Sequence, residues 1–328
     1  MKKILNILFI TNYAKNYGGG HFVRCNKLAK KLKKNNTIFF LIDDKDKNIS
    51  NILVKNSKLI INKNIFKKEK RLIKIIQSLK NPIVIIDSYL STFNLEKKIY
   101  PFCKKLIVID DLKKKHFCDI YINPNLINFK FARKIKAKIK LLGTKYSFLD
   151  INSNIKVKKK KLSYLRNILI FFGATDSRNF SIKIYKAIQD KKISFLNFKM
   201  IKGYRNDKLA NVIKNNKLRN FKFLNFSKNF IKNLKNTDIF ISSGGSSVWE
   251  SIFFKKKTLI FNHSKKQFEN SENLEKKGLV KQFKKRLSSK NIYDFLISES
   301  QLKNKNIFIH KNLLDTKGIE RIQKIILQ

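Results

Sequence analysis

The sequence predicts an α/β protein made of two Rossmann-like domains, and three observations carry that prediction. Short apolar runs alternate along the chain with stretches of helical periodicity, a pattern typical of parallel strands joined by helices. Acidic residues follow several of the apolar runs, where the carboxyl ends of strands would lie. Six of the ten glycines fall into three groups that also follow apolar runs: Gly18 to Gly20, Gly173, and Gly244 with Gly245.

The first domain is predicted over residues 1–145. The run P-I-V-I-I-D begins at Pro82 and is apolar up to its final aspartate, which is typical of a parallel strand buried on both faces. The lysine-rich segment Phe129–Lys161 has few apolar runs, so we expect it to contain the crossing between the domains. The other predicted strands are Ile4–Thr11, Thr37–Ile42, Lys58–Ile61, Leu106–Asp110 and Asp119–Ile122, and the predicted helices are His21–Leu32 and Lys68–Leu79.

The second domain is predicted over residues 146–328. Its first strand begins at Asn167 and ends at Gly173. A helix over Gln267–Lys277 is stopped by Gly278, because glycine readily adopts the left-handed conformation that ends helices. The other predicted strands are Phe195–Ile201, Phe221–Leu224, the run beginning at Ile239, and Thr258–Phe261, and the other predicted helices are Arg178–Ile188 and Gly318–Leu327. The terminal helix could pack back on the first domain.

The net charge of +52 is the most prominent property of the composition. Such a charge raises the possibility of binding to nucleic acid. Lysine, however, is spread along the whole chain, and Asn, Ile and Phe are plentiful too, as expected for an A+T-rich genome. We therefore favour a solvated lysine surface, whose positive field would help to capture an anionic ligand. A non-specific nucleic-acid-binding protein remains an alternative of a different class.

The hydrophobic fraction of 43% excludes wholesale disorder. No apolar run approaches the roughly eighteen residues that a membrane-spanning helix needs. The N-terminal segment lacks a small-residue cleavage site, so we interpret it as a first strand and expect a cytoplasmic protein without stable membrane insertion. Cys25, Cys103 and Cys118 lack the spacing of metal or redox motifs, and we assign them to packing.

The segment Ile239–Phe254 predicts a strand, a glycine turn and a capped helix. Its apolar run is followed by Gly244 and Gly245, and apolar residues then recur at helical spacing. The first turn of a helix leaves N–H groups unpaired and carries partial positive charge, so this turn suits a phosphate group. Glu250 lies one turn into the predicted helix, where its carboxylate could accept hydrogen bonds from ribose. An ordinary strand-to-helix turn is the alternative.

Seven motifs, taken in order, carry a resemblance to a known family: Y-G-G-G-H-F-V-R, V-I-I-D-S-Y, V-I-D-D, C-D-I-Y-I-N, L-L-G-T-K-Y-S-F-L, F-F-G-A-T-D and S-S-G-G-S-S-V-W-E. The chain resembles the UDP-sugar hydrolases of pseudaminic acid biosynthesis from residue 1 to about residue 282. Those enzymes remove UDP from UDP-2,4-diacetamido-2,4,6-trideoxy-β-L-altropyranose. They are related to the glycosyltransferase that makes lipid II, so the resemblance implies a GT-B-like fold with a cleft between its two Rossmann-like domains.

The resemblance also implies roles for matching residues. His21, at the end of the glycine motif, would be the general base that activates water, and Tyr89 would approach the same centre. Glu250 would hold the ribose. The remaining residues implied in binding the substrate or its UDP group are Gly18, Gly20, Arg24, Asp87, Gly173, Thr175, Asp176, Ser243, Gly244, Gly245, Ser246 and Gln267.

The chain departs from the family pattern at two places. Ala174 stands where the family often has a second glycine, so that loop could be tighter. Lys266 precedes Gln267 where the family often has asparagine, beside an apparent one-residue insertion. The contacts of loop 262–267 with a sugar are therefore not fixed by the resemblance.

The chemistry of such a hydrolysis fits these residues. A histidine with a pKa near neutrality can activate water, and the alternative for His21 is a capping or packing role. UDP is a good leaving group that needs only N–H donors and positive potential, so we expect no metal and no cofactor. A GT-B glycosyltransferase that transfers the sugar to an acceptor is the second hypothesis. We expect a small-molecule UDP-sugar as the partner, no specific nucleic acid, and a monomer.

Overall fold

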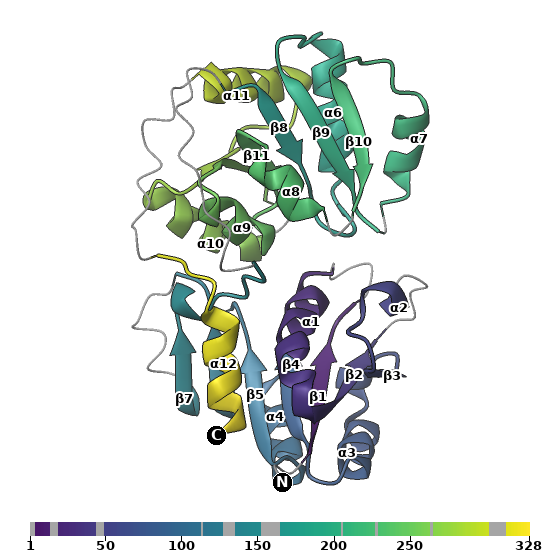
Figure 1. The fold of residues 1–328 in the computed structure, drawn as a ribbon, viewed down its shortest axis with the longest axis vertical. Coiled ribbons are helices and arrows are strands. Elements are labelled where there is room, and N and C mark those ends of the chain that lie inside the picture. Colours follow the sequence, from purple (N-terminus) through teal and green to yellow (C-terminus); the bar gives the residue numbers. More distant parts are fainter. Residues whose placement is uncertain are drawn as a thin grey trace. The chain divides into compact units, whose positions relative to one another are not determined.

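The computed structural model describes residues 4–13, 19–43, 49–112, 114–126, 135–151, 165–204, 206–226, 229–262, 265–301 and 313–328. The chain forms two compact units. The first comprises Met1–Asn152 together with Leu314–Gln328, and the second comprises Ser153–Leu313. Each unit is a parallel β-sheet covered by helices, as Figure 1 shows. The predicted class, two Rossmann-like α/β domains, is confirmed.

The first unit contains a seven-stranded sheet in the order β3-β2-β1-β4-β5-β6-β7, with every neighbouring pair parallel. Its strands are β1 (Leu5–Thr11), β2 (Asn36–Ile42), β3 (Lys58–Ile61), β4 (Ile83–Asp87), β5 (Lys105–Ile109), β6 (Phe117–Asn123) and β7 (Lys136–Leu142). Its helices are α1 (Gly20–Leu32), α2 (Ile49–Ile52), α3 (Glu69–Ser78), α4 (Phe93–Ile99) and α12 (Gly318–Leu327). Short 3-10 turns connect several of these elements.

Strand β1 shows how this sheet carries a core on both faces. Alternate side chains of a strand point to opposite faces. Ile7 and Phe9 belong to the apolar cluster that also contains residues of α1 and α12. Leu8 and Ile10 belong to the cluster that contains residues of α3 and α4. The continuous apolar runs of the sequence therefore mark strands that are covered on both faces.

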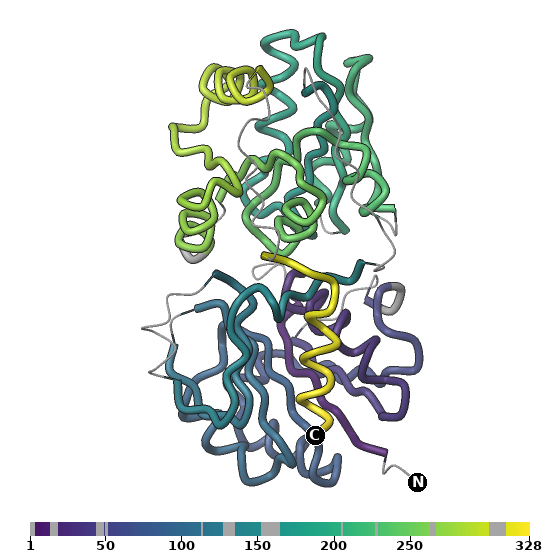
Figure 2. The backbone as a smooth tube through the Cα atoms, turned by 60° about the vertical axis from the view of Figure 1, so that its left-hand side comes forward, coloured from purple at the N-terminus to yellow at the C-terminus, as the bar shows by residue number. Residues whose placement is uncertain are grey.

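The terminal helix α12 belongs to the first unit, where it lies beside α1 (Figures 1 and 2). Ile319, Ile322 and Ile326 are buried in the same core cluster as the inward face of α1. The helix begins at Gly318, where a Cβ atom would lie 2.3 Å from the backbone oxygen of Ser147. Only glycine allows α12 to approach Ser147, which follows the 3-10 turn Thr144–Tyr146, so closely.

The second unit contains a six-stranded parallel sheet in the order β10-β9-β8-β11-β12-β13. Its strands are β8 (Asn167–Ile170), β9 (Asn197–Lys202), β10 (Phe221–Asn225), β11 (Ile239–Ser242), β12 (Lys257–Ile260) and β13 (Lys281–Gln282). Its helices are α6 (Phe180–Asp190), α7 (Lys208–Lys214), α8 (Phe230–Lys235), α9 (Ser247–Phe253), α10 (Lys265–Lys276) and α11 (Ser289–Gln301). In each sheet the first strand of the unit is third in the order, and the strand order reverses beside it, between β1 and β4 or between β8 and β11.

Several elements were not among those predicted from the sequence: β7, β13, α2, α4, α7, α8 and α11. Strand β7 lies inside the segment that we assigned to the domain crossing, and the first unit extends to Asn152 rather than to residue 145. As an edge strand it alternates lysines with smaller or apolar residues, so it lacks the apolar run of a central strand. Helix α11 was not predicted because its apolar residues are interrupted by serines and acidic side chains.

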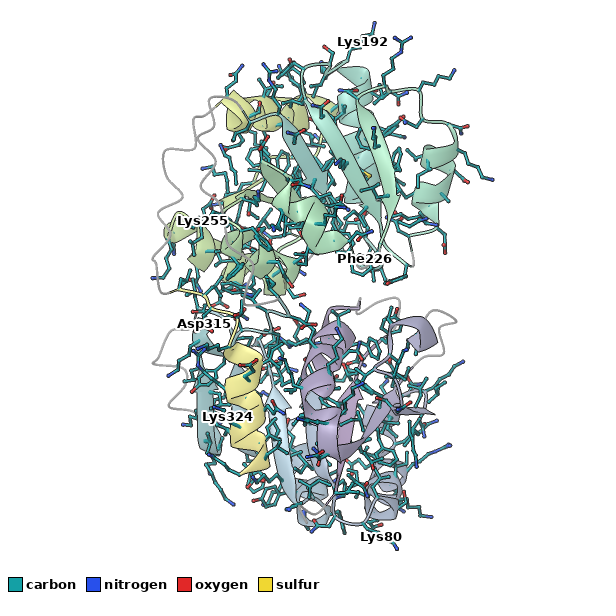
Figure 3. The ribbon with its side chains drawn as sticks, viewed as in Figure 1. Lys80, Lys192, Phe226, Lys255, Asp315 and Lys324 are labelled. Atoms are coloured by element: carbon teal, nitrogen blue, oxygen red, sulfur yellow. The ribbon has the colours of Figure 1, made fainter. Side chains whose placement is uncertain are left out.

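Many of the lysines extend into solvent. Figure 3 shows Lys80, Lys192 and Lys324 projecting from the surfaces of the two units, and all three are exposed. Some surface lysines form ion pairs, such as Lys30 with Asp150 at 2.8 Å. In the part of the chain that the structure describes, no helix is long and apolar enough to cross a bilayer.

We expect Gly318→Ala to destabilise the first unit. The new methyl group would meet the backbone of Ser147, which cannot move aside as a side chain could. Overpacking of this kind costs roughly 1–3 kcal/mol. Urea unfolding of the full chain should show this loss, whereas Lys324→Ala, an exposed substitution in the same helix, should leave the midpoint nearly unchanged. Equal midpoints for the two variants would contradict the close approach.

Candidate functional site

The two sheets share a feature that locates ligand sites in open α/β folds. Ligands bind outside the carboxyl ends of the strands, where the strand order reverses. In the first unit this point lies between β1 and β4, and in the second between β8 and β11. His21 follows β1 and Asp87 ends β4. Gly173 follows β8, and Ser243 follows β11. The sequence-predicted residues thus gather at the reversal point of each sheet.

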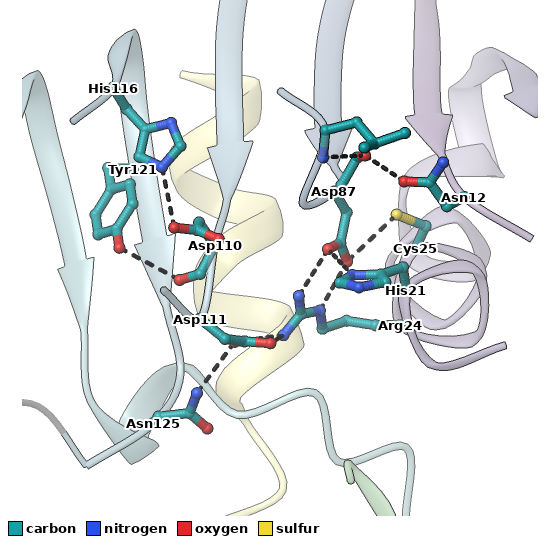
Figure 4. A network of polar contacts seen from close by, with 12 residues as sticks. Asn12, His21, Arg24, Cys25, Asp87, Asp110, Asp111, His116, Tyr121 and Asn125 are labelled. Atoms are coloured by element: carbon teal, nitrogen blue, oxygen red, sulfur yellow. Dashed lines mark hydrogen bonds and ion pairs between the residues drawn. The ribbon is translucent and has the colours of Figure 1, made fainter. Parts of the chain in front are cut away.

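His21 and Asp87 form the central contact of the first unit (Figure 4). The Nδ1 atom of His21 lies 2.6 Å from Oδ1 of Asp87. Asp87 is 0% exposed and His21 is 7% exposed. Burial alone would raise the pKa of Asp87, but Arg24 and His21 outweigh burial and lower it to about 2. An ionised carboxylate only accepts hydrogen bonds, so Nδ1 carries the proton of this contact and Nε2 is the ring nitrogen left to accept one.

Arg24 connects two carboxylates in this site. Its Nε and Nη2 atoms donate to the two oxygens of Asp87, each at 2.7 Å. Its Nη1 atom donates to both oxygens of Asp111, at 2.8 and 2.9 Å. The sequence prediction assigned Arg24 and Asp87 to substrate binding. Both are buried and engaged with each other, so the geometry assigns them to holding the site rather than to direct contact with a ligand.

The ring of Tyr89 packs edge-on against the ring of His21, with centroids 4.4 Å apart. Burial, followed by the charge of Asp111, raises the pKa of Tyr89 well above its ordinary value, so the phenol keeps its proton. Lys114 donates a hydrogen bond through Nζ to the backbone oxygen of Tyr89 and ties this loop to the segment after β5. Tyr89 thus lies beside His21, as the resemblance implies.

A second buried histidine supports the same edge of the sheet. His116 is 1% exposed and lies between Glu96, at 2.8 Å from Nδ1, and Asp110, at 3.1 Å from Nε2. Burial alone would lower the pKa of His116, but the hydrogen bonds to Asp110 and Glu96 outweigh it and raise the pKa to about 9. His116 is therefore a charged structural residue that holds β5 and α4 together.

In the second unit, the loop after β8 is shaped by backbone geometry. Gly173 has a φ of 83°, and Gly203 approaches it so closely that a Cβ on Gly203 would lie 2.1 Å from the Gly173 oxygen. Asp176 accepts the N–H groups of Phe180 and Ser181, at 2.9 and 2.8 Å, and so caps α6. Its carboxylate is buried, and burial raises its pKa. The geometry therefore assigns Asp176 to the loop itself rather than to a nucleotide.

The glycine corner after β11 packs against a set of hydrogen-bonded side chains. Gly244 has a φ of 74°, and a Cβ atom there would lie 2.7 Å from Oγ of Ser271. Ser271 donates to Asn262 at 2.8 Å, and Asn262 donates to Gln282 at 2.7 Å. At Gly245 we expected a backbone that adopts positive φ or approaches a phosphate. Positive φ occurs at Gly244 and not at Gly245, which has open space around its Cβ position.

The other predicted residues of this unit follow β8, β11 or β12 in the chain. Ser243 and Glu250 are buried, and Glu250 lies in α9. Ser246 is exposed and precedes α9, but its side chain forms no capping hydrogen bond, contrary to the expected capped helix. Thr175 is half-buried after β8, and Gln267 is half-buried in α10.

Gly18 lies outside the described part of the chain, as do residues 263–264 of loop 262–267 and the side chain of Lys266. Gly20 begins α1, and no atom lies within 4 Å of its Cβ position. Within the described ranges, no group of three or more His, Cys, Asp and Glu side chains is arranged to hold a metal ion.

Two residues were missed by the sequence analysis. Asp111 follows a predicted strand but was not assigned to the site, although its position after an apolar run was a signal. Gly203 was not singled out, yet it is one of only ten glycines and follows a predicted strand.

Several solved structures of low sequence identity have a similar fold. MurG of Acinetobacter baumannii matches with a TM-score of 0.65 and 13% identity, over 98% of this chain and 99% of that one. The UDP-GlcNAc 2-epimerase of Methanocaldococcus jannaschii, in complex with UDP-GlcNAc and UDP, matches with a TM-score of 0.65 and 12% identity, over 98% and 99%. These similarities and the two parallel sheets define a protein of GT-B-like fold.

A match at the sequence level is more specific. Residues 167–308 match the family model described as Glycosyltransferase family 28 C-terminal domain, which covers most of the second unit. The chain is also 30% identical over 269 residues to Uncharacterized protein MJ1062 of Methanocaldococcus jannaschii, covering 76% of this chain and 54% of that protein. The chain thus spans about half the length of this curated relative.

The buried His116 predicts a pH dependence of stability. Its pKa is about 9 in the folded chain and about 6.5 when unfolded. The stabilisation is therefore fully present below about pH 6.5 and is lost as the pH rises through about 9, by an amount on the order of 3 kcal/mol.

Denaturant unfolding at a series of pH values between these limits should show this loss in the wild type. His116→Gln should be less stable at low pH, because it leaves two buried carboxylates without a cation, but its stability should change less across the same range. Parallel curves for the two proteins would show that His116 does not titrate there.

Proposed function

We propose that the protein hydrolyses a UDP-sugar and that His21 activates the attacking water. The observation that carries the proposal is the contact of His21 Nδ1 with the buried, ionised Asp87 at 2.6 Å. This contact leaves Nε2 as a proton acceptor, which is what a general base requires. Further support comes from the family 28 match and from the solved neighbours that bind UDP or UDP-GlcNAc.

The chemical step needs few groups. The water oxygen forms a bond to the anomeric carbon as its proton moves to Nε2 of His21. The bond between that carbon and the β-phosphate oxygen breaks, and the electron pair leaves with UDP. Asp87 stabilises the imidazolium that forms, since its charge lies against Nδ1. Tyr89 keeps its proton and can donate a hydrogen bond to the sugar.

We assign the UDP group to residues of the second unit. Gly173 and Gly244 have positive φ, and they follow β8 and β11, the two strands between which the strand order reverses. Backbone N–H groups at such a position suit phosphate oxygens. Glu250, in the helix that follows the glycine corner, would accept hydrogen bonds from the ribose hydroxyls.

The sequence motifs favour UDP-2,4-diacetamido-2,4,6-trideoxy-β-L-altropyranose as the substrate, in pseudaminic acid biosynthesis. Glycosyl transfer is the second candidate function, because the family model that matches the second unit describes glycosyltransferases. The two functions differ only in the acceptor, which is water in one case and a hydroxyl group in the other.

The two candidates separate in a reaction that contains only the protein, a UDP-sugar and ¹⁸O-labelled water. A panel of UDP-2,4-diacetamido sugars with UDP-GlcNAc as a comparison would be followed by chromatography and mass spectrometry. Hydrolysis at the anomeric carbon releases stoichiometric UDP and places the label in the sugar. Label in the UDP phosphate would show attack at phosphorus, and no release would favour transfer.

Replacing the proposed base should remove catalysis and leave nucleotide binding intact. His21→Asn keeps a polar side chain but cannot accept a proton at neutral pH. We expect kcat to fall by about 10²–10⁴, the usual contribution of a positioned base. The affinity for UDP, measured by calorimetry, should remain that of the wild type. Wild-type turnover in this variant would show that the base lies elsewhere.

Replacing the proposed ribose ligand should have the opposite effect. Glu250→Ala should weaken UDP binding by roughly 1.5–3 kcal/mol, the range for a hydrogen bond to a charged group. Glu272→Ala is the matched control, because it removes an exposed carboxylate of the same unit that pairs with Lys276. Calorimetry that finds the same UDP affinity in both folded variants would remove Glu250 from the site.

A further inference from the structure

We propose that Arg24 is a positioning residue, which fixes the buried Asp87 carboxylate so that His21 is held with its proton on Nδ1. The proposal rests on the function proposed above for His21. It gives Arg24 a role that does not require contact with the substrate, and it extends that role to Asp111, the second carboxylate that Arg24 binds.

The geometry of the guanidinium group carries the argument. Nε and Nη2 form parallel hydrogen bonds with the two oxygens of Asp87, which fixes both the position and the plane of the carboxylate. Oδ1 of Asp87 then accepts from His21 Nδ1 and from Arg24 Nη2. The orientation of the imidazole is thus determined through one shared oxygen atom.

Asp111 completes the arrangement from the other side of the guanidinium. Both of its oxygens accept from Nη1, and Asn125 donates to Oδ1 of Asp111 at 3.1 Å. The guanidinium carbon also lies over the ring of Phe148, 5.6 Å from its centroid. Arg24 is therefore fixed by strand β4, by the segment after β5 and by an aromatic ring, as Figure 4 shows for the two carboxylates.

The groups that surround His21 carry a net negative charge. Asp87 and Asp111 carry two negative charges, and Arg24 carries one positive charge. The neighbouring Tyr89 and the thiol of Cys25, which lies 3.7 Å from Asp87, remain uncharged because burial raises the pKa of each. Uptake of a proton by His21 therefore brings the net charge of the cluster from −1 to zero.

Lysine cannot replace arginine in this arrangement. Its ammonium group is a single point and cannot form the parallel pair with Asp87 and also bind Asp111. In Arg24→Lys the Asp87 carboxylate should rotate toward the ammonium, and its contact with Nδ1 should lengthen. Neutral imidazole should then populate the tautomer with its proton on Nε2, which cannot act as the base.

The test measures the tautomer directly and does not require turnover. Long-range ¹H–¹⁵N spectra of the histidine rings would be recorded at a pH above the ordinary histidine range, and His21→Asn would assign the signal. In the wild type we expect His21 with its proton on Nδ1. Arg24→Lys should show a substantial Nε2–H population, and Asp87→Asn, whose amide can donate to Nδ1, provides a reference for that tautomer.

Kinetics supply the second readout. Arg24→Lys should lower kcat by roughly 10²-fold with KM nearly unchanged, because misplacement of the base affects the chemical step and not binding. Lys30→Ala, which removes an exposed ion pair from the same helix, should behave as the wild type. If Arg24→Lys does not fold, Asp111→Asn gives the same comparison, with a smaller change expected in both readouts.

The outcomes distinguish this inference from the proposed function. A wild-type tautomer and wild-type kcat in folded Arg24→Lys would overturn the positioning role. A raised KM with unchanged kcat would overturn it in favour of a substrate contact. If the wild type releases no UDP from any sugar, the proposed function fails, whereas the tautomer measurement still supports or overturns the role of Arg24.

Discussion

The site of the first unit depends on one buried charge. Asp87 ends a central strand, is fully buried, and remains ionised because Arg24 and His21 donate to it. A carboxylate without such partners would lose several kcal/mol in leaving water and would take up a proton instead. His21 and Arg24 both lie in α1, so the charge of Asp87 couples this helix to β4.

The proposed site of the second unit is shaped by backbone conformation rather than by a buried charge. Its two glycine turns follow the strands at the reversal point of the sheet, and in each turn a glycine makes a contact that a larger residue would prevent. Gly203 is close to the carbonyl groups of the first turn, and the Ser271 hydroxyl is close to Gly244 in the second. The phosphate site that we propose at these turns would use backbone N–H groups and no cationic side chain, which is consistent with a lysine content that is spread over the chain.

Most of the fold could be predicted from the sequence because its central strands are continuous apolar runs. Strand β4 is an example, since all five of its residues are buried. The periphery could not be predicted in the same way. Strand β7 lies at the edge of the sheet, and most of its residues are not buried. Lysines therefore alternate with apolar residues, and the apolar signal is weak. The edge position that weakens the signal is visible only after the sheet has been assembled.

The candidate site was likewise predicted only in part from the sequence. The residue types and their order indicated His21, Asp87 and the glycine turns. They did not indicate which residues touch one another, because Arg24 and Asp111 are far apart in the sequence, with several strands and helices between them. Asp176 illustrates the difficulty, since an acidic residue after a strand can bind a ligand or cap the following helix. Only the hydrogen bonds to Phe180 and Ser181 distinguish the two.

The return of the last helix to the first unit has a consequence for biosynthesis. Residues 314–328 complete the first unit, but the ribosome makes them only after the whole of the second unit. Until then, the core cluster that contains α1 lacks the side chains of Ile319, Ile322 and Ile326, and the apolar surface that these side chains cover is exposed. A chain truncated after residue 313 would therefore lack α12 and expose an apolar face of the first unit, which is a substrate for chaperones.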